Sequence, residues 1–305
     1  MSLDTLLITD KASVRKAWNK TDQDVKEYVK IIKIWLETQK HLPEIPNDNV
    51  IEFFLTNCKY SVEKTKQNID MYYSIRDLMP DLFRNIHPCK PDEIQSALNT
   101  GIVISLPKLT PDLYRVNVFQ YKVFDPSVCD MAKFCAHYMC NVYEVRIQED
   151  LVMGDIFIVD YEHMNFKVMT QITPVLLKNC AQVLEKVQSN RMKALHLINP
   201  PSYLDAALAL FKSFFPKKLK DRFHTHKTVE DLYAYVPREI LPSDLGGEEK
   251  SLKELEGLWM KKFEQYKERF DKLATMKIDE SLRPEKLEND EILGYHGNFK
   301  KLNVD

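Results

Sequence analysis

The first ninety residues carry apolar side chains at helical spacing and show no strand pattern. Thr21 and Asp24 have the spacing of a capping box, and the apolar positions behind them repeat at intervals of three and four. Similar patterns predict helices over residues 48–57 and 61–79. Because each stripe is narrow, we expect these helices to pack on one another as an all-helical N-terminal domain over residues 1–95.

From residue 114 the pattern changes to apolar runs that alternate with helical patterns. Strands are expected at 114–123, 155–160, 194–199 and 223–226, and helices at 125–142, 166–188, 203–215 and 251–273. Strands separated by helices of this length imply a mostly parallel sheet with right-handed crossovers. We therefore predict an α/β domain over residues 96–250, followed by a C-terminal helix and a polar surface tail over 251–305.

Composition and charge exclude several classes of protein. The 305 residues hold 43 lysines and arginines against 45 acidic residues, so no global positive field favours nucleic acid. The start of the chain lacks a signal-peptide pattern, and no apolar run approaches the roughly 20 residues that span a bilayer. The six cysteines form no C-x-x-C pair. We expect a cytoplasmic chain with reduced cysteines that acts as a monomer and can associate peripherally with membranes.

Candidate catalytic and metal-binding patterns are weak. The seven glycines form no G-x-G-x-x-G, no Walker loop and no G-x-S-x-G, so we predict no cofactor and no enzymatic activity. Asp160 and Glu162 have a spacing that suits acid–base work, but a cap or salt bridge at a strand end is the favoured interpretation. His224 and His226 would share one side of a strand, as metal ligands could, but the sequence offers no third ligand nearby and we predict no metal site.

Residues 203–215 form the most apolar helical segment of the chain. A helix of this composition is usually buried in a core; the alternative is a lid that covers a cavity and swings into a membrane interface. The basic run Lys217-Lys218-Leu219-Lys220-Asp221-Arg222 follows directly. A charge run is usually a solvated helix face, but its position beside this helix favours a lid flanked by an anion-binding patch.

Four segments together resemble one family. They are FFLTNCKYSVEK at 53–64, the strand at 155–162 with QITP at 171–174, KALHLINPP at 193–201 running on to residue 226, and LPSDLGG at 241–247. In order and spacing over about 24–260 they resemble the CRAL-TRIO lipid-carrier family, in its tocopherol-transfer, retinaldehyde-binding and clavesin branch. This resemblance implies an all-helical N-terminal bundle and an α/β domain whose mostly parallel sheet, flanked by helices, encloses a hydrophobic cavity under a lid helix.

The resemblance also implies site residues. Tocopherol-transfer members bind phosphoinositide head groups through basic residues beside the lid, and the matching positions here are Arg191, Lys193, Lys218 and Arg222. The implied ligand-binding residues are Phe134, His137, Asn141, Val159, Phe166, Ile172, Cys180, Val183, Leu184, Met192 and Leu195, with Leu204, Phe211 and Phe215 on the lid. His137 and Asn141 are more polar than the small hydroxyl residues of tocopherol carriers, so the family does not name the ligand.

The sequence therefore leads to two functional hypotheses. The first is a carrier that holds one hydrophobic lipid, such as a tocopherol, retinoid, carotenoid or other isoprenoid, and delivers it to membranes with release aided by transient phosphoinositide binding. The alternative is a membrane-signalling adaptor that reads phosphoinositides and has no transferable cargo.

Overall fold

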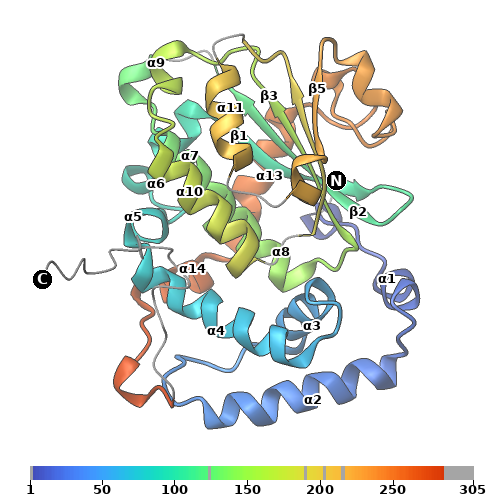
Figure 1. The fold of residues 1–305 in the computed structure, drawn as a ribbon, viewed down its shortest axis with the longest axis vertical. Coiled ribbons are helices and arrows are strands. Elements are labelled where there is room, and N and C mark those ends of the chain that lie inside the picture. The colour runs from blue at the N-terminus through green and yellow to red at the C-terminus, as the bar shows by residue number, and fades with distance from the viewer. Residues whose placement is uncertain (1–2, 123–124, 189–190, 202–203, 214–216, 285–305) are drawn as a thin grey trace, which may run out of the picture.

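The N-terminal third of the protein is helical, as the sequence predicts (Figure 1). The computed structural model describes residues 3–122, 125–188, 191–201, 204–213 and 217–284. Thr21 and Asp24 form the expected capping box, and Asn47 and Ser61 cap the next two long helices. The elements are η1 (Leu3–Thr5), α1 (Lys11–Ala17), α2 (Asp22–Thr38), α3 (Asp48–Asn57), α4 (Val62–Leu78), α5 (Pro80–Phe83) and α6 (Pro91–Thr100).

A five-stranded sheet follows, with the strands side by side in chain order. They are β1 (Gly101–Leu109), β2 (Tyr114–Tyr121), β3 (Gly154–Asp160), β4 (Met192–Ile198) and β5 (Phe223–His226). β2 to β5 run parallel, whereas β1 pairs antiparallel with β2. The predicted α/β fold with a helical N-terminal region and a mostly parallel sheet is confirmed, but the edge strand β1 was not predicted.

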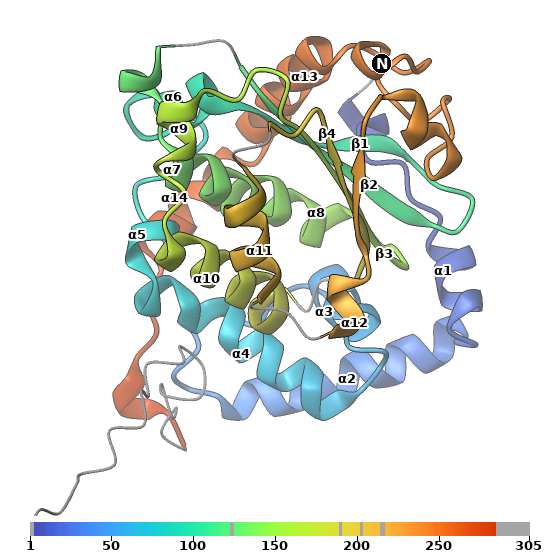
Figure 2. The same ribbon diagram turned by 45° about the horizontal axis from the view of Figure 1, so that its top comes forward.

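The crossovers between the parallel strands supply the helices that cover one face of the sheet. Strands taken in order with right-handed crossovers place their connections on the same side, and Figures 1 and 2 show α7, α8, α10 and α11 there. The crossovers contain η2 (Pro126–Val128), α7 (Met131–Ala136), η3 (His137–Val142) and α8 (Tyr143–Glu149); then α9 (Phe166–Met169), α10 (Pro174–Gln182) and η4 (Val183–Val187); then α11 (Asp205–Ser213) and α12 (Lys217–Lys220).

Three of the predicted helices differ from the observed ones. The helix expected over 251–273 is divided into two, Leu252–Gln265 and Lys267–Thr275. Asp125 caps the short turn η2, and the long helix begins only at Met131, where Asp130 provides a second cap. The helix expected over 166–188 is interrupted, because Thr173 caps a new helix that has Pro174 in its first turn. A proline favours a helix start and cannot continue the preceding turn.

The C-terminal segment covers the sheet at β1. Its elements are η6 (Glu230–Ala234), η7 (Ser243–Leu245), α13 (Leu252–Gln265), α14 (Lys267–Thr275) and η8 (Glu280–Leu282). The indole nitrogen of Trp259 in α13 donates to the carbonyl oxygen of Ser105 in β1 at 3.0 Å. At the turn before α13, a side chain in place of Gly247 would lie 2.0 Å from the carbonyl oxygen of Leu241, so this close approach requires glycine. Residues 285–305 of the predicted tail lie outside the described residues.

At the end of the sheet where β2 and β3 begin, a buried group of charged side chains connects β1, β2, β3 and α8. Arg115 bonds to Asp150 at 2.7 Å, and Arg146 bonds to Asp150 at 3.1 Å and to Asp155 at 2.7 Å. All four side chains are at most 4% exposed. Arg115 also donates to the carbonyl oxygens of Leu106 and Pro107 in β1. We call these four residues the buried ion network.

Candidate functional site: an apolar cavity beside a basic cleft

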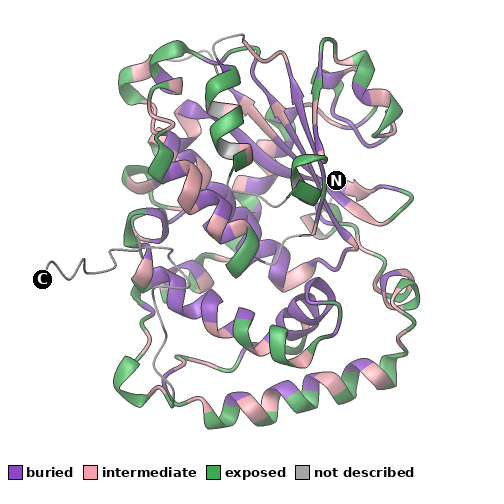
Figure 3. Ribbon diagram, viewed as in Figure 1, coloured by how far each residue is buried: buried purple, intermediate pink, exposed green. Residues whose placement is uncertain are grey.

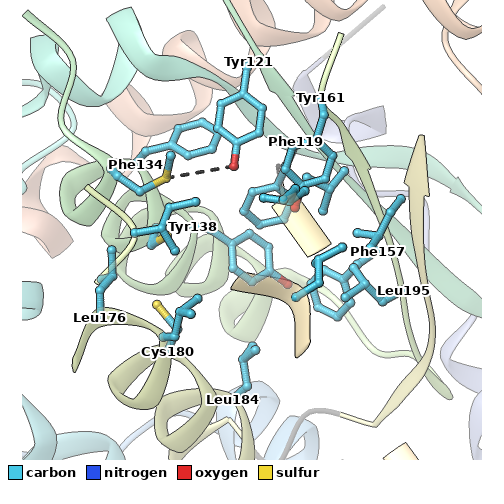
Figure 4. Close-up of a pocket in the computed structure, with 18 of the residues that line it drawn as sticks. Phe119, Tyr121, Phe134, Tyr138, Phe157, Tyr161, Leu176, Cys180, Leu184 and Leu195 are labelled. Carbon is cyan, nitrogen blue, oxygen red and sulfur yellow. Dashed lines mark hydrogen bonds between the residues drawn. The ribbon is translucent and has the colours of Figure 1, made fainter. Parts of the chain in front are cut away.

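A cavity of about 180 Å³ lies between the sheet and the helices of the crossovers. Its wall comes from β2, β3 and β4 on one side and from α7, α10 and α11 on the other. Figure 4 shows these side chains directed toward a common space. The lining residues are Phe119, Tyr121, Met131, Phe134, Cys135, Tyr138, Met139, Phe157, Val159, Tyr161, Ile172, Leu176, Leu177, Cys180, Leu184, Met192, Leu195, Leu197, Leu204 and Leu208.

One wall of the cavity is aromatic. The ring of Phe119 lies 5.9 Å from that of Phe134 and 5.1 Å from that of Tyr138, and Tyr138 lies 5.7 Å from Phe157. Tyr121 and Tyr161 add a further pair with centroids 5.4 Å apart. These contacts are tilted or edge-to-face, which is the arrangement that aromatic quadrupoles prefer. The result is a continuous group of rings from β2, β3, α7 and η3.

The opposite wall consists of aliphatic and sulfur-containing side chains. α10 contributes Leu176 and Cys180, and α11 with the residue before it contributes Leu208 and Leu204. The thiol of Cys180 forms a hydrogen bond with that of Cys135, and this bond together with burial raises the pKa of Cys180. Leucine, methionine and cysteine side chains adapt their shape more easily than packed rings do.

α11 covers this wall without being buried itself. Leu204 is 1% exposed against the cavity, whereas Leu210 is 36% exposed and Ala206 and Ala209 face solvent. Figure 3 shows the green, exposed outer surface of α11 above the purple, buried strands. An apolar helix with an exposed outer face fits the lid interpretation of residues 203–215 better than that of an ordinary core helix.

The structure brings many of the sequence-predicted ligand residues together on the cavity wall, although their binding role stays a prediction. The predicted residues that line the cavity are Phe134, Val159, Ile172, Cys180, Leu184, Met192, Leu195 and Leu204. Phe166 is instead 57% exposed on α9, and Val183 is buried in η4 away from the wall. The side chain of Phe211 and all of Phe215 lie outside the described residues.

His137 and Asn141 point away from the cavity, in contrast to their predicted positions. The amide of Asn141 bonds to Nδ1 of His137 at 2.9 Å and donates to the carbonyl oxygen of Ile86. The ring of His137 packs against Phe263 of α13, and burial lowers its pKa to about 3, so the imidazole is neutral at neutral pH. The pair therefore joins the long helix to its neighbours on the side opposite the cavity.

The helix presents other positions to the cavity. Met131, Cys135 and Tyr138 are members of the apolar stripe of this helix, and all three line the cavity. The stripe in the chain itself thus indicated the cavity face, which among the positions carried over from the family on this helix only Phe134 shares. Alternation along β2 and β3 accounts for Phe119, Tyr121 and Phe157 in the same way.

Basic side chains adjoin the cavity where β4 begins. The guanidinium of Arg191 lies 4.4 Å above the ring of Trp18, and the ammonium of Lys193 lies 5.6 Å from the ring of Tyr114. Arg222 donates to the carbonyl oxygen of Met192, whose side chain lines the cavity. Burial, with the nearby charge of Arg222, lowers the pKa of Arg191.

These cations have no acidic partners in the part of the chain that the structure describes. No ion pair there involves Arg191, Lys193 or Arg222. Lys218 is exposed on α12, four residues before Arg222. Arg191 and Arg222 are near enough for the charge of Arg222 to lower the pKa of Arg191, and cations near each other without carboxylates favour the binding of an anion. We call Arg191, Lys193, Lys218 and Arg222 the basic cleft.

The other candidate groups have structural roles. The carboxylate of Asp160 accepts from the backbone of Glu162 at 3.0 Å and from the side chains of Gln120 and Asn199, so it fixes the strand end. His226 bonds to His196 at 2.8 Å, and His224 stacks beside them. Stacked rings do not converge on one point, and no group of three or more His, Cys, Asp or Glu residues within the described ranges could hold a metal ion.

Comparisons with known proteins agree with this architecture. Residues 99–247 match the CRAL/TRIO domain, and residues 21–93 match the Pinta-like, UBA domain. The chain is 26% identical to alpha-tocopherol transfer protein-like from Mus musculus over 196 residues. This alignment covers 64% of this chain and 56% of the relative. It is 24% identical over 203 residues to Clavesin-2 from Rattus norvegicus, which covers 66% of this chain and 62% of that relative.

The chain therefore carries a CRAL/TRIO domain, and the predicted family is confirmed. The matched region spans less than two thirds of the length of these curated relatives. The crystal structure of Sfh5 aligns over 85% of this chain and 99% of its own, with 13% identity and a TM-score of 0.42. Within the described ranges, every helix is too short or too polar to cross a bilayer.

Proposed function

We propose that this protein carries one hydrophobic lipid in the cavity and delivers it to membranes. The observation that supports this most is the cavity itself, an apolar space of about 180 Å³ directly beneath α11. Apolar cavities of about 150 Å³ are known to stay dry and to bind small hydrocarbons. Each 100 Å² of lipid surface buried there contributes about 2.5 kcal/mol, so a lipid can bind tightly without any chemical step.

Movement of α11 is the proposed route for entry and release. A full-length lipid needs more space than a single ring, and α11 exposes its outer side at Ala206, Ala209 and Leu210. Exposed apolar side chains occur on α11 itself (Leu210, 36% exposed), on α10, which contacts α11 (Val175, 63%), and on α9 (Phe166, 57%). Apolar side chains gathered beside an exit favour contact with a membrane interface.

The basic cleft would couple this movement to the membrane. Phosphoinositide head groups present several phosphates, and each accepts charge-assisted hydrogen bonds from arginine or lysine. Because Arg222 holds the backbone of Met192, a phosphate that draws Arg222 away would loosen a residue of the cavity wall. We therefore propose that phosphoinositide binding aids release.

We propose no catalytic reaction for this site. The polar groups of the cavity are tyrosine hydroxyls and thiols. Burial raises the pKa of Tyr161. The hydrogen bond to Cys135, together with burial, raises the pKa of Cys180. Protonated phenols and thiols are poor nucleophiles. Protonated phenols and thiols therefore give this cavity no strong nucleophile.

The test of release is the double variant Lys218→Ala/Arg222→Ala, assayed for transfer of a bound lipid between liposomes. We expect transfer to acceptor liposomes containing phosphoinositide to fall by about tenfold or more, because two charge-assisted contacts are lost. Transfer to neutral liposomes should not change. Lys26→Ala/Lys30→Ala, which removes two exposed cations from α2, is the matched control. Unchanged transfer by the cleft variant would overturn the proposed release step.

A further inference from the structure

Two cysteines on the helical wall of the cavity lie against each other. Cys135 of α7 and Cys180 of α10 both line the cavity, and the thiol of Cys180 forms a hydrogen bond with that of Cys135. Figure 4 shows Cys180 between Leu176 and Leu184 on this wall. Both thiols also lie near one phenol, because burial raises the pKa of Tyr121 and Cys135 and Cys180 add to that shift. The two sulfur atoms thus meet at one place, although their helices belong to different crossovers of the sheet.

This contact distinguishes the pair from other cysteines of the chain. Cys89, Cys129 and Cys140 each bond to an oxygen atom. An oxidised thiol beside an oxygen atom has no second sulfur there with which to react. Two thiols in contact can instead form a disulfide, and other thiols reduce such a bond again.

The two thiols differ in exposure and in how firmly they hold a proton. Cys135 is partly exposed, whereas Cys180 is buried. The hydrogen bond to Cys135, together with burial, raises the pKa of Cys180, so Cys180 keeps its proton at neutral pH. An oxidant from outside therefore meets Cys135 first, and Cys180 is placed to react second.

α10 connects this pair to the lid. It contacts α11, and Leu176 of α10 and Leu208 of α11 line the same cavity. A covalent bond in place of the hydrogen bond would draw α10 toward α7 and hold it there. Because both helices form the wall, the space left for a lipid would shrink, and closely packed interiors tolerate such a change poorly.

We propose that Cys135 and Cys180 form a reversible disulfide in the cavity wall, which a peroxide produces and which closes the cavity to lipid. The disulfide is independent of the carrier function, whereas its effect on cargo rests on that proposed function. Disulfides in a reducing compartment are usually transient and respond to oxidants, so this bond would regulate the cavity rather than stabilise the fold.

The reaction consumes one peroxide for each disulfide. The sulfur of Cys135 attacks the terminal oxygen of a peroxide ROOH, the O–O bond breaks, and the leaving oxygen takes the thiol proton to give ROH and a sulfenic acid. The sulfur of Cys180 then attacks that of Cys135, the S–O bond breaks, and hydroxide leaves with the Cys180 proton as water. Both sulfurs are oxidised and the peroxide is reduced. Since protonated thiols attack slowly, this is a slow modification and not a catalytic cycle.

The site is tested on the purified, reduced full chain with hydrogen peroxide as the oxidant. After treatment, remaining thiols are blocked with N-ethylmaleimide, and peptides are mapped by mass spectrometry without reduction. We expect a linked peptide that joins Cys135 to Cys180 and disappears with dithiothreitol. Cys180→Ser should leave a sulfenic acid at Cys135 that dimedone labels. Cys129→Ser, which removes another partly exposed thiol close to α7, is the matched control and should leave the linked peptide unchanged.

The effect on cargo is tested with the neutral apolar probe N-phenyl-1-naphthylamine, whose fluorescence rises in an apolar site. Peroxide should weaken its binding to the unmodified chain about tenfold or more, because the narrowed cavity no longer accommodates the probe without strain. Dithiothreitol should restore binding. In Cys135→Ser and Cys180→Ser the same treatment should change little. These variants also control for oxidation of the methionines in the wall, which dithiothreitol does not reverse.

Each readout has a result that contradicts the proposal. Absence of the linked peptide, or an equal amount of linked Cys135 and Cys129, would overturn the disulfide. A linked peptide with unchanged probe binding would overturn the effect on cargo while the carrier function stands. If the reduced chain binds no probe and organic extraction of the purified protein yields no lipid, the proposed function fails and the effect on cargo with it, whether or not the disulfide forms.

Discussion

The buried ion network and the basic cleft use the same side chains in opposite ways. In the network, Arg115 and Arg146 are fully buried and each bonds to Asp150. In the cleft, Arg191 and Arg222 lie close to each other and have no carboxylate partner among the described residues. Arg191 stacks on Trp18 instead, which orients its guanidinium without cancelling its charge.

The difference indicates what each region is for. A buried cation is tolerated when a carboxylate compensates it, and such a group fixes the elements around it. A partly exposed cation without a partner keeps its charge available for an anion that arrives from outside. The network therefore serves the fold, and the cleft is the region in which we expect charge to serve binding.

The largest effect should come from breaking the buried ion network. Asp150→Ala leaves Arg115 and Arg146 buried without their shared partner and should lower the free energy of unfolding by about 3–5 kcal/mol. Urea denaturation measures the change. Asp22→Ala, which removes the exposed partner of Arg15, should cost less than about 1 kcal/mol. Similar losses for both variants would contradict the structural role of the network.

A smaller loss of stability should follow from a change at Glu44, a partly exposed carboxylate that pairs with Arg269 and Lys272. Burial alone would raise its pKa, but Lys272, Arg269 and Tyr73 outweigh that and hold the pKa of Glu44 below its usual 4.5. A depressed carboxyl pKa contributes stability above the unfolded pKa, and this contribution is lost as the pH falls through the folded pKa.

The variant Glu44→Gln tests this sign. At pH 7 it should lower the free energy of unfolding by about 1–2 kcal/mol, and the difference from the unmodified chain should shrink below about pH 4.5. Urea denaturation between pH 7 and pH 3 measures the profile. A difference that stays constant with pH would contradict the assigned ion pairs with Arg269 and Lys272.

The smallest effect should come from Trp18, which contacts the cleft through Arg191. Trp18→Leu removes the surface on which the guanidinium rests and should weaken binding to phosphoinositide-containing vesicles about threefold, the size of one modest cation–π contact. Vesicle co-sedimentation measures the binding. The same substitution at Trp35 in α2 is the control, and an equal loss there would exclude a specific role for Trp18.

Local signals in the sequence predicted much of the fold. The capping box at Thr21 and the stripe through Met131, Cys135 and Tyr138 both correspond to what the structure shows. β1 was missed because its apolar run is continuous and contains Pro107, which is tolerated since β1 lies at the sheet edge. Strand pattern alone does not distinguish such a run from a buried helix.

Contacts between distant segments could not be predicted in the same way. The bond of Arg115 to Asp150 and the stack of Trp18 on Arg191 join residues 35 and more positions apart, and no spacing rule brings them together. His137 and Asn141 were misplaced because a register carried over from relatives does not fix the rotation of one helix. The position of Tyr138 against Arg146 likewise becomes visible only in three dimensions.

The central claim is that the cavity holds a lipid, and native mass spectrometry of the purified full chain tests it most directly. The account predicts a species heavier than the polypeptide by the mass of one lipid molecule, and organic extraction should release that lipid in a one-to-one ratio to protein. A mass equal to that of the polypeptide, with nothing extractable and no uptake from lipid-containing liposomes, would contradict the carrier and favour an adaptor that reads phosphoinositides without cargo.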